Sequence, residues 1–356
     1  MQLTLIIPEL IWPEPDDRDT LDTLACPALN TVLVRSRLLR RPPQSLEATL
    51  TDAFGLPEGA PYAPLRLLGE SAGPAVPAAG AGDPCWLCAD PVHLRFHQER
   101  LILADSGSFG IDRAEAAAIV DDLNRHFSGI GHFHVAAPDR WYLQLSASSP
   151  LGAFNVPPLS AIAGRSVEQQ LPDSTPARAL RQLLNEAQML LHAHPANAAR
   201  EQAGRLPINS LWLWGAGTLP VIAEKVFDGV WSAQPLAIGL GCAVGAPTRP
   251  APHHADELLS VAASASRQLV VLDDLLGPVQ YENGEAYGAA LRALETRWFA
   301  PVQKALAAGK LTQLRIEAST AYGALTWKSH RSDQWKLWRR AQPLSKIAHS
   351  LAKGIA

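Results

Sequence analysis

The sequence predicts an α/β protein with a doubly wound, mostly parallel sheet and an inserted α+β domain. Apolar strand-like runs alternate with amphipathic stretches over residues 176–316, as in a sheet built from strand–helix–strand units. A stretch of small residues with three prolines, 71–84, interrupts the chain before this region. We therefore expect a discontinuous core domain of residues 1–83 and 151–356, and an inserted domain of residues 84–150.

The inserted domain is predicted to hold a hairpin, a helix and a further strand. Trp86–Phe96 and Arg100–Leu103 have the composition of two neighbouring strands. Asp112 is a typical N-cap residue, and the apolar positions after it have helical spacing (Ala116, Ile119, Val120 and Leu123). Trp141–Leu145 is the last expected strand, after which a proline-containing segment, 146–175, returns to the core domain.

The core domain is expected to begin with a strand at Leu3–Ile7 and to resume with a helix over 176–193. Leu211–Trp214 is apolar on both faces, which is typical of a central parallel strand, and ends in a glycine turn at Gly215 and Gly217. Taken alone, this pattern also fits a buried strand without any ligand. The elements expected after it are apolar segments at 221–226 and 236–244, a strand at 269–272, a long helix over 285–308 and a strand at 311–316.

Composition limits the class of protein and its partners. The 356 residues are 47% hydrophobic and 18% charged, which suits two folded domains. A net charge of -3 argues against nucleic acid or an anionic membrane as the main partner. The first apolar run has no basic residue ahead of it and soon meets Pro8, so we expect neither a signal peptide nor a membrane span, and a cytoplasmic protein.

Two segments carry a resemblance to a known family. The motif residues in 192–220 are Asn197, Arg200, Pro207, Asn209, Trp212, Trp214, Gly215, Gly217 and Pro220. They resemble the signature of archaeal-type, cofactor-independent phosphoglycerate mutases, which belong to the alkaline phosphatase superfamily, and residues 85–124 resemble that family's inserted domain. The chain also resembles a proteobacterial branch of RpfE-type regulatory proteins. The resemblance implies an alkaline-phosphatase-like core, two divalent metal ions and a serine nucleophile.

The metal ligands that the resemblance implies are mostly replaced. The family's Ile-Pro-Asp-Gly at the first strand reads Ile7-Pro8-Glu9-Leu10 here. Its Asp-His pair precedes a histidine by ten residues, and counting back from His330 gives Thr320 and Ala321. A hydroxyl and a methyl group cannot hold Mn²⁺ or Zn²⁺ as a carboxylate and an imidazole do.

The third ligand cluster and the nucleophile also depart from the family. Asp273 and Asp274 stand where a histidine-containing Gly-His-Asp-Gly cluster is expected. Ser45 lies near the nucleophile's position, but the aspartate that should follow it is Leu46, so a surface or helix-capping serine is the alternative. The resemblance implies that Arg140, Arg200 and Lys328 could bind a small phosphorylated ligand. The alternative is a structural or solvent-exposed role.

Two functions follow from these departures. The preferred one is a degenerate mutase-like protein without the dinuclear site and without a cofactor, acting in regulation or ligand binding. The alternative is an active metal-dependent phosphoglycerate mutase or phosphatase with rearranged ligands (Glu9, Asp273, Asp274 and His330) around one Mn or Zn ion.

Two further groups of residues have side chains that are typical of binding sites. Cys85 and Cys88 form a Cys-x-x-Cys pair that we expect to be structural, with a redox role, or a zinc site shared with nearby histidines, as the alternatives. The segment 327–342 interleaves three tryptophans (Trp327, Trp335 and Trp338) with basic residues. We expect a helix with the tryptophans packed inward. A protein partner bound through these tryptophans is the alternative.

Overall fold

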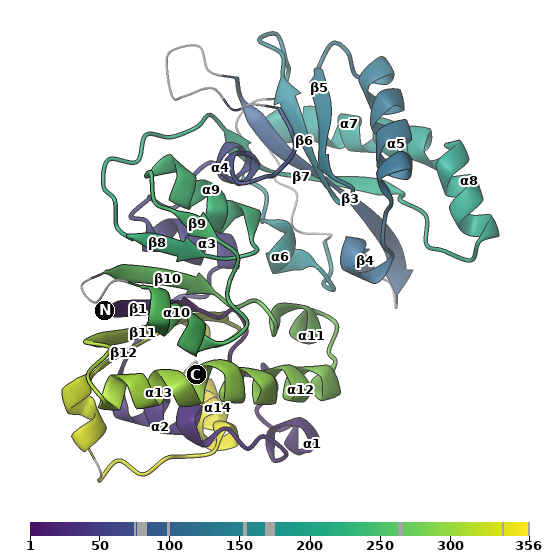
Figure 1. Cartoon of the computed structure of the whole chain (residues 1–356). Coiled ribbons are helices and arrows are strands. Elements are labelled where there is room, and N and C mark those ends of the chain that lie inside the picture. The colour runs from purple at the N-terminus through teal and green to yellow at the C-terminus, as the bar shows by residue number, and fades with distance from the viewer. Residues whose placement is uncertain are drawn as a thin grey trace. The chain divides into compact units, whose positions relative to one another are not determined.

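In the computed structural model the chain forms two compact units (Figure 1). Unit 1 comprises Met1–Gly55 and Glu224–Ala356, and unit 2 comprises Leu56–Ala223. The structure describes residues 1–74, 76, 84–97, 100–151, 155–167, 175–262, 266–336 and 338–354. Part of the expected linker, 71–84, lies outside these residues. The expected insertion, 84–150, falls inside unit 2, which also takes in residues on both sides of it.

Unit 1 is built on a seven-stranded, mostly parallel sheet in the order β2-β12-β11-β1-β10-β8-β9. The neighbours from β11 to β9 are parallel, whereas β12 runs antiparallel to both β11 and β2. The prediction of a mixed α/β protein with a mostly parallel sheet is therefore confirmed. The strands are β1 (Gln2–Ile6), β2 (Arg37–Arg41), β8 (Gly229–Trp231), β9 (Thr248–Arg249), β10 (Arg267–Val271), β11 (Gln313–Thr320) and β12 (Gly323–His330).

Helices cover both faces of this sheet because its strands are apolar on both sides (Figure 1). Leu3 and Leu5 of β1 join a buried cluster with α2, α12, α13 and α14, whereas Ile6, directly after Leu5, is buried on the opposite face. On that face α3 contacts β11 and α9, and α9 contacts β8. The helices are α1 (Arg18–Leu21), α2 (Pro27–Arg35), α3 (Leu46–Ala53), α9 (Pro235–Ala243), α10 (Ala255–Val261), α11 (Leu276–Gln280), α12 (Gly284–Leu294), α13 (Ala300–Ala307) and α14 (Leu344–Lys353).

The long helix expected over 285–308 is present, with a π-helical turn, η2 (Glu295–Phe299), between α12 and α13. Pro301 lies in the first turn of α13, directly after this irregularity. Proline cannot donate a backbone hydrogen bond, so a change of helical pitch just before it is expected.

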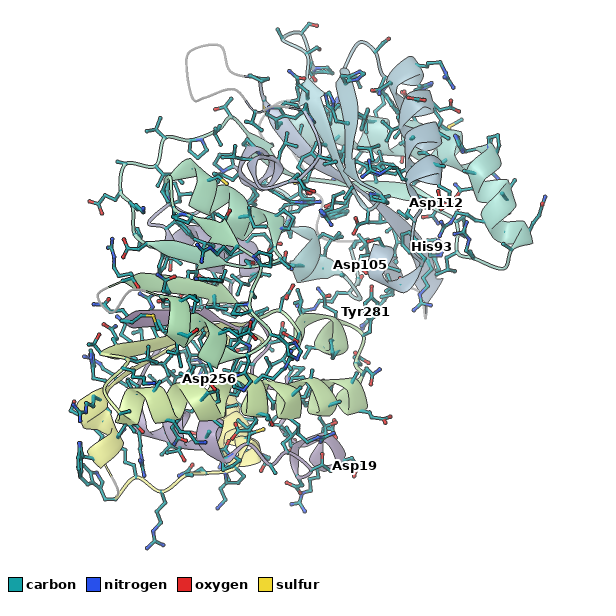
Figure 2. The ribbon with its side chains drawn as sticks, viewed as in Figure 1. Asp19, His93, Asp105, Asp112, Asp256 and Tyr281 are labelled. Carbon is teal, nitrogen blue, oxygen red and sulfur yellow. The ribbon has the colours of Figure 1, made fainter. Side chains whose placement is uncertain are left out.

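Unit 2 contains an antiparallel sheet in which β3 (Trp86–His97) pairs with β4 (Arg100–Ala104), β6 (Arg140–Leu145) and β7 (Ser210–Gly217). The fifth strand, β5 (Gly131–Ala137), pairs with β6. The hairpin, the strand at Trp141–Leu145 and the Asp112-capped helix α5 (Arg113–His126) were all predicted correctly, and Figure 2 labels Asp112 at the start of α5. The other helical segments are α4 (Tyr62–Leu68), η1 (Ser106–Ser108), α6 (Leu159–Ile162), α7 (Thr175–His192) and α8 (Pro195–Gln202).

The placement of Leu211–Trp214 in the parallel core sheet is wrong. These residues form the buried strand β7, which is antiparallel to β3 in unit 2. Helices α4 and α7 both contact β7, and burial on both faces produces the same apolar run in either kind of sheet. The expected glycine turn is also wrong, because β7 continues through Gly215 and Gly217, with an irregularity in its pairing with β3. The two glycines have φ of 70° and 150°, and a Cβ on Gly217 would lie 2.6 Å from that of Pro61.

Two further expectations need correction. Residues 221–226 form no regular element, and the strand in this region is β8. The segment 327–342 is not one helix, because Trp327 lies buried in β12 and the chain continues into a short 3-10 turn, η3 (Arg331–Trp335). Trp335 and Trp338 are 72% and 76% exposed rather than packed inward. Within the described ranges, no helix is both long and apolar enough to cross a bilayer.

Candidate functional site

The carboxyl ends of the parallel strands in unit 1 gather several of the residues predicted from the sequence. Glu9 follows β1, Asp273 follows β10 and Thr320 ends β11. Because these three strands are adjacent and parallel, the three residues come to one edge of the sheet, the usual position of a ligand site in such folds. The Glu9 amide donates a hydrogen bond to the Ser319 carbonyl at 2.8 Å, which ties the loop after β1 to β11.

The two aspartates after β10 are engaged by neighbouring side chains. The Gln234 amide donates a hydrogen bond to the Asp273 carboxylate. Asp274 pairs with Arg297 at 3.1 Å. These contacts satisfy part of the acceptor capacity that a cation would need.

Thr320 belongs to a tight hairpin between β11 and β12. Its hydroxyl donates to the Gly323 carbonyl at 2.9 Å and accepts from the Tyr322 amide at 3.2 Å. Thr320 and Gly323 are themselves cross-strand partners, so the turn holds only Ala321 and Tyr322. The hydroxyl at this position therefore stabilises a turn, where the resemblance implied a metal-binding carboxylate.

His330 and Lys328 lie toward the opposite edge of the sheet. His330 is paired with Gln313 at the start of β11, and Lys328 is paired with Arg315. Gln313, the partner of His330, and Ser319 are six residues apart on β11. At about 3.3 Å per residue, this separation is roughly 20 Å. The predicted grouping of His330 with Glu9, Asp273 and Asp274 around one ion is therefore contradicted. Counting along the chain missed it because β12 reverses direction.

The remaining donors do not fit the metal centre that the resemblance implies. Two bridged ions need several carboxylate and imidazole ligands at one place. Across the described part of the chain, no three His, Cys, Asp or Glu side chains are arranged to hold a metal ion. Glu9 and Asp273 alone cannot replace such a set.

Ser45 reaches the same edge as Glu9, because β2 runs parallel to β11 and ends at Arg41. Its side chain accepts a hydrogen bond from the Ala48 amide at 3.1 Å and caps α3. The helix-capping alternative is therefore confirmed. The role of Ser45 as a nucleophile stays a prediction.

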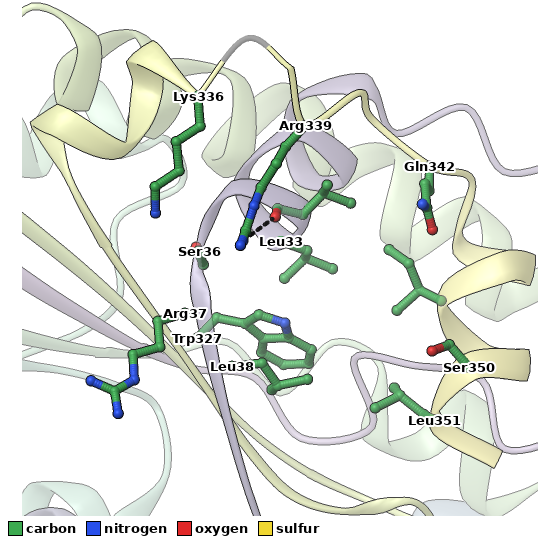
Figure 3. Close-up of a pocket in the computed structure, with 12 residues that line it drawn as sticks. Leu33, Ser36, Arg37, Leu38, Trp327, Lys336, Arg339, Gln342, Ser350 and Leu351 are labelled. Carbon is green, nitrogen blue, oxygen red and sulfur yellow. Dashed lines mark hydrogen bonds between the residues drawn. The ribbon is translucent and has the colours of Figure 1, made fainter. Parts of the chain in front are cut away.

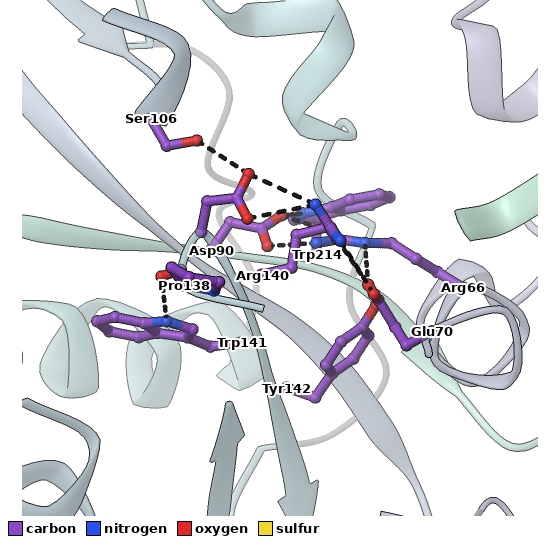
Figure 4. Close-up of polar contacts among 10 residues, drawn as sticks. Arg66, Glu70, Asp90, Ser106, Pro138, Arg140, Trp141, Tyr142 and Trp214 are labelled. Atoms are coloured by element: carbon purple, nitrogen blue, oxygen red, sulfur yellow. Dashed lines mark hydrogen bonds and ion pairs between the residues drawn. The ribbon is translucent and has the colours of Figure 1, made fainter. Parts of the chain in front are cut away.

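Unit 2 contains a buried charge network, shown in Figure 4, that includes Arg140. Arg66 binds both oxygens of Asp90 at 2.7 Å, and the Trp214 indole donates to the same carboxylate at 2.8 Å. Arg140 binds both oxygens of Glu70 at 2.8 and 3.1 Å, and its third nitrogen contacts Asp139 at 3.2 Å. Every nitrogen of Arg140 thus has a carboxylate partner, which favours the structural alternative for this residue.

Sequence reasoning missed Arg66, Glu70 and Asp90. Asp90 alone carried a signal, because a carboxylate within an otherwise apolar strand needs a buried partner. Burial raises the pKa of Tyr142, and the nearby positive charge of Arg66 offsets only part of that effect. The Tyr142 hydroxyl donates a hydrogen bond to Glu70 at 2.8 Å.

Arg200 is fully buried and acts within unit 2. Its guanidinium donates to the carbonyls of Leu206, Phe109 and Gly110 at 2.7–2.9 Å and pairs with Glu115 at 2.9 Å. The side chain is 0% exposed, so the geometry favours its structural alternative as well.

The Cys-x-x-Cys pair lies at the start of β3. Cys88 is buried, and burial raises the pKa of Cys85. A raised pKa keeps the thiol protonated, which opposes a redox or metal-binding thiolate and favours structural cysteines.

Known proteins support the resemblance at low identity. No protein-family model matches the chain. A probable 2,3-bisphosphoglycerate-independent phosphoglycerate mutase of Geobacter sulfurreducens is 30% identical over 158 residues, covering 41% of this chain and 37% of that protein. A 2,3-bisphosphoglycerate-independent phosphoglycerate mutase of Methanosarcina mazei is 27% identical over 252 residues, covering 64% of this chain and 59% of that protein.

A solved structure extends the match to the whole fold. The PH0037 protein from Pyrococcus horikoshii superposes with a TM-score of 0.57 at 14% identity, covering 99% of this chain and 95% of that chain. The matched segments span 37% and 59% of the two mutases' lengths. The chain is thus homologous to cofactor-independent phosphoglycerate mutases at low identity, and it shares its fold with the Pyrococcus protein.

Proposed function

We propose that this protein is a non-catalytic homologue of the cofactor-independent phosphoglycerate mutases. It acts in regulation by binding a ligand or a partner, as the resemblance to RpfE-type proteins implies. Its core is alkaline-phosphatase-like, and its ligand is a small phosphorylated molecule or a protein partner. The observation that carries the proposal is the hairpin at Thr320. There the Thr320 hydroxyl makes two hydrogen bonds within a tight turn, at the strand end where the resemblance implies metal ligands.

The amount of transition-state stabilisation that metal ions would supply supports the proposal. Metal ions supply several kcal/mol of transition-state stabilisation, and each ~1.4 kcal/mol corresponds to a tenfold change in rate. A chain that holds Glu9 and Asp273 at this edge but places His330 at the other would lose most of that contribution. We therefore expect no measurable mutase turnover.

An active metal-dependent mutase or phosphatase is the alternative, and the 27% identity over 252 residues favours it. It would require an ion held near Glu9 and Asp273 with ligands beyond those predicted from the sequence. Such a site would bind Mn or Zn stoichiometrically.

The test measures metal content and activity on the same preparation. Protein purified with Mn²⁺ and Zn²⁺ is assayed for bound metal and for conversion of 3-phosphoglycerate to 2-phosphoglycerate. We expect metal well below one ion per chain and no turnover above background, in the wild type and in Glu9→Gln and Asp273→Asn alike. Stoichiometric metal that disappears in these two variants, together with turnover, would overturn the proposal. Calorimetric titration of the wild type with 3-phosphoglycerate then separates binding of this ligand from binding of a protein partner.

A further inference from the structure

Unit 1 contains a cavity of about 500 Å³ at the amino end of β2, shown in Figure 3. It lies between the end of α2, the start of β2, the segment after η3 and α14. The cavity is away from Glu9 and Asp273, because Arg37 is paired with Lys328 toward the other edge of the sheet. The mutase resemblance assigns no role to any residue of its lining.

The inner wall of the cavity is apolar. Trp327 is only 2% exposed and forms part of this wall beside Leu38, which is 42% exposed. Leu33, Val34, Ile347 and Leu351 complete the apolar lining. A hollow of about 500 Å³ lies within the ~300–1,000 Å³ usual for small-molecule sites.

The rim of the cavity is basic. Arg37, Lys336 and Arg339 line it, with the Arg37 guanidinium turned away from the hollow (Figure 3), and none of its described lining residues carries a carboxylate. Lys336 is paired with Asp333 at 2.6 Å, so its charge is partly balanced from outside the lining. Arg339 donates one hydrogen bond, to the Val34 carbonyl at 3.3 Å, and Figure 3 shows its guanidinium turned toward the cavity.

The charge is concentrated at this part of an otherwise acidic protein. Residues 327–356 contain seven lysines and arginines and one acidic residue, Asp333, whereas the whole chain has a net charge of -3. Ordinary solvated cations would point away from an apolar hollow. Here the Arg339 guanidinium is turned toward the hollow and Lys336 lies at its rim, so an apolar body and an anionic head group can be bound together.

We propose that this cavity binds a small amphipathic anion. Its aromatic or short acyl body lies against Trp327 and Leu38, and its carboxylate, sulfonate or phosphate group lies against Lys336 and Arg339. The site is independent of the sheet edge at Glu9 and of any activity there. Trp335 and Trp338, which are exposed nearby, are not part of it.

The first test uses a fluorescent aromatic sulfonate, 8-anilinonaphthalene-1-sulfonate, and a neutral counterpart, N-phenyl-1-naphthylamine. We expect saturable binding of one sulfonate per chain, competed by decanoate, and at least tenfold weaker binding of the neutral dye. Arg339→Gln should weaken sulfonate binding about five- to tenfold, the usual effect of losing one charge-assisted contact. Arg340→Gln is the matched control, because it removes the same charge from an exposed neighbour outside the lining and should change affinity less than twofold.

Three results would overturn the proposal. Equal effects of Arg339→Gln and Arg340→Gln would show general electrostatic attraction rather than a site. Equal binding of the neutral dye would show an apolar surface without selection for the anion. Loss of binding in a Trp335→Ser, Trp338→Ser double variant, with Arg339→Gln unaffected, would place the dye on the exposed tryptophans. Thermal unfolding of each variant confirms that the fold is intact before its affinity is compared.

Discussion

Glu317 on β11 is a buried carboxylate whose titration opposes the folded state. Its side chain is 2% exposed and pairs with Arg315 on the same strand face. Burial raises the pKa of Glu317, and the opposite charge of Arg315 offsets only part of that effect. The folded protein therefore binds a proton here more tightly than the unfolded chain does, so this residue costs stability as the pH rises above the unfolded carboxyl's value.

We expect Glu317→Gln to stabilise the protein at pH 7.5, on the order of 1 kcal/mol, because an uncharged amide costs less to bury. The gain should vanish below about pH 4, where the glutamate is protonated in both states and resembles the amide. Urea unfolding of the wild type and the variant at pH 4 and 7.5 measures the difference. A less stable variant at pH 7.5 would show that the ion pair with Arg315 outweighs the cost of burial.

Single residues were predictable where their role is local. Asp112 and Ser45 cap the helices that begin directly after them, and capping depends on neighbours within three residues. Arg66 and Asp90 are 24 residues apart and meet only through the pairing of α4 with β3, so spacing along the chain carried no sign of their contact.

Among the elements, α2 depends on a side chain from another helical segment. Its N-cap residue, Cys26, makes no side-chain capping bond. The buried carboxylate of Glu295, in η2, instead accepts the amides of Ala28 and Leu29 at 2.7 and 3.1 Å. A negatively charged acceptor at the N-terminus of a helix accepts hydrogen bonds from amides that have no partner within the helix. It also interacts favourably with the positive end of the helix dipole.

We expect Glu295→Gln to lower the free energy of unfolding by about 1–2 kcal/mol, because the amide keeps one acceptor oxygen and loses the charge. Glu285→Gln is the control. Glu285 also lies in a first helical turn, that of α12, but it is exposed, so its loss should cost less than about 0.5 kcal/mol. Equal costs in chemical denaturation would contradict the capping role of Glu295.

Elements were predictable from periodicity, whereas their partners were not. The apolar run in β7 correctly predicted a buried strand, but its hydrogen-bonded neighbour is β3, more than a hundred residues away. The turn at Ala321 and Tyr322 likewise escaped notice, because the residues around it lack the glycine and asparagine pairs that usually announce a hairpin. That turn decides where His330 lies, so the candidate metal site failed at the same step.

For the whole molecule, the two units have separate hydrophobic cores. The cluster of unit 2 extends from Ala63 to Trp214 and contains only residues of that unit, whereas the cluster of unit 1 draws on both of its segments. In unit 1, β1 lies between β10 and β11 and pairs with both. The first segment is therefore indispensable to the sheet of unit 1, and unit 2 needs no residue from outside its own range to form its core.

We expect a fragment of residues 56–223 to fold alone, with one cooperative thermal transition and a mixed helix and strand circular dichroism spectrum, because its core is complete and its length suits a single domain. A fragment of residues 224–356 should show no cooperative transition, since β10 and β11 lose the strand between them. Adding residues 1–55 to it through a short flexible linker should restore the transition. If the 56–223 fragment remained unfolded while the 224–356 fragment melted cooperatively, the division of the core between the units would be wrong.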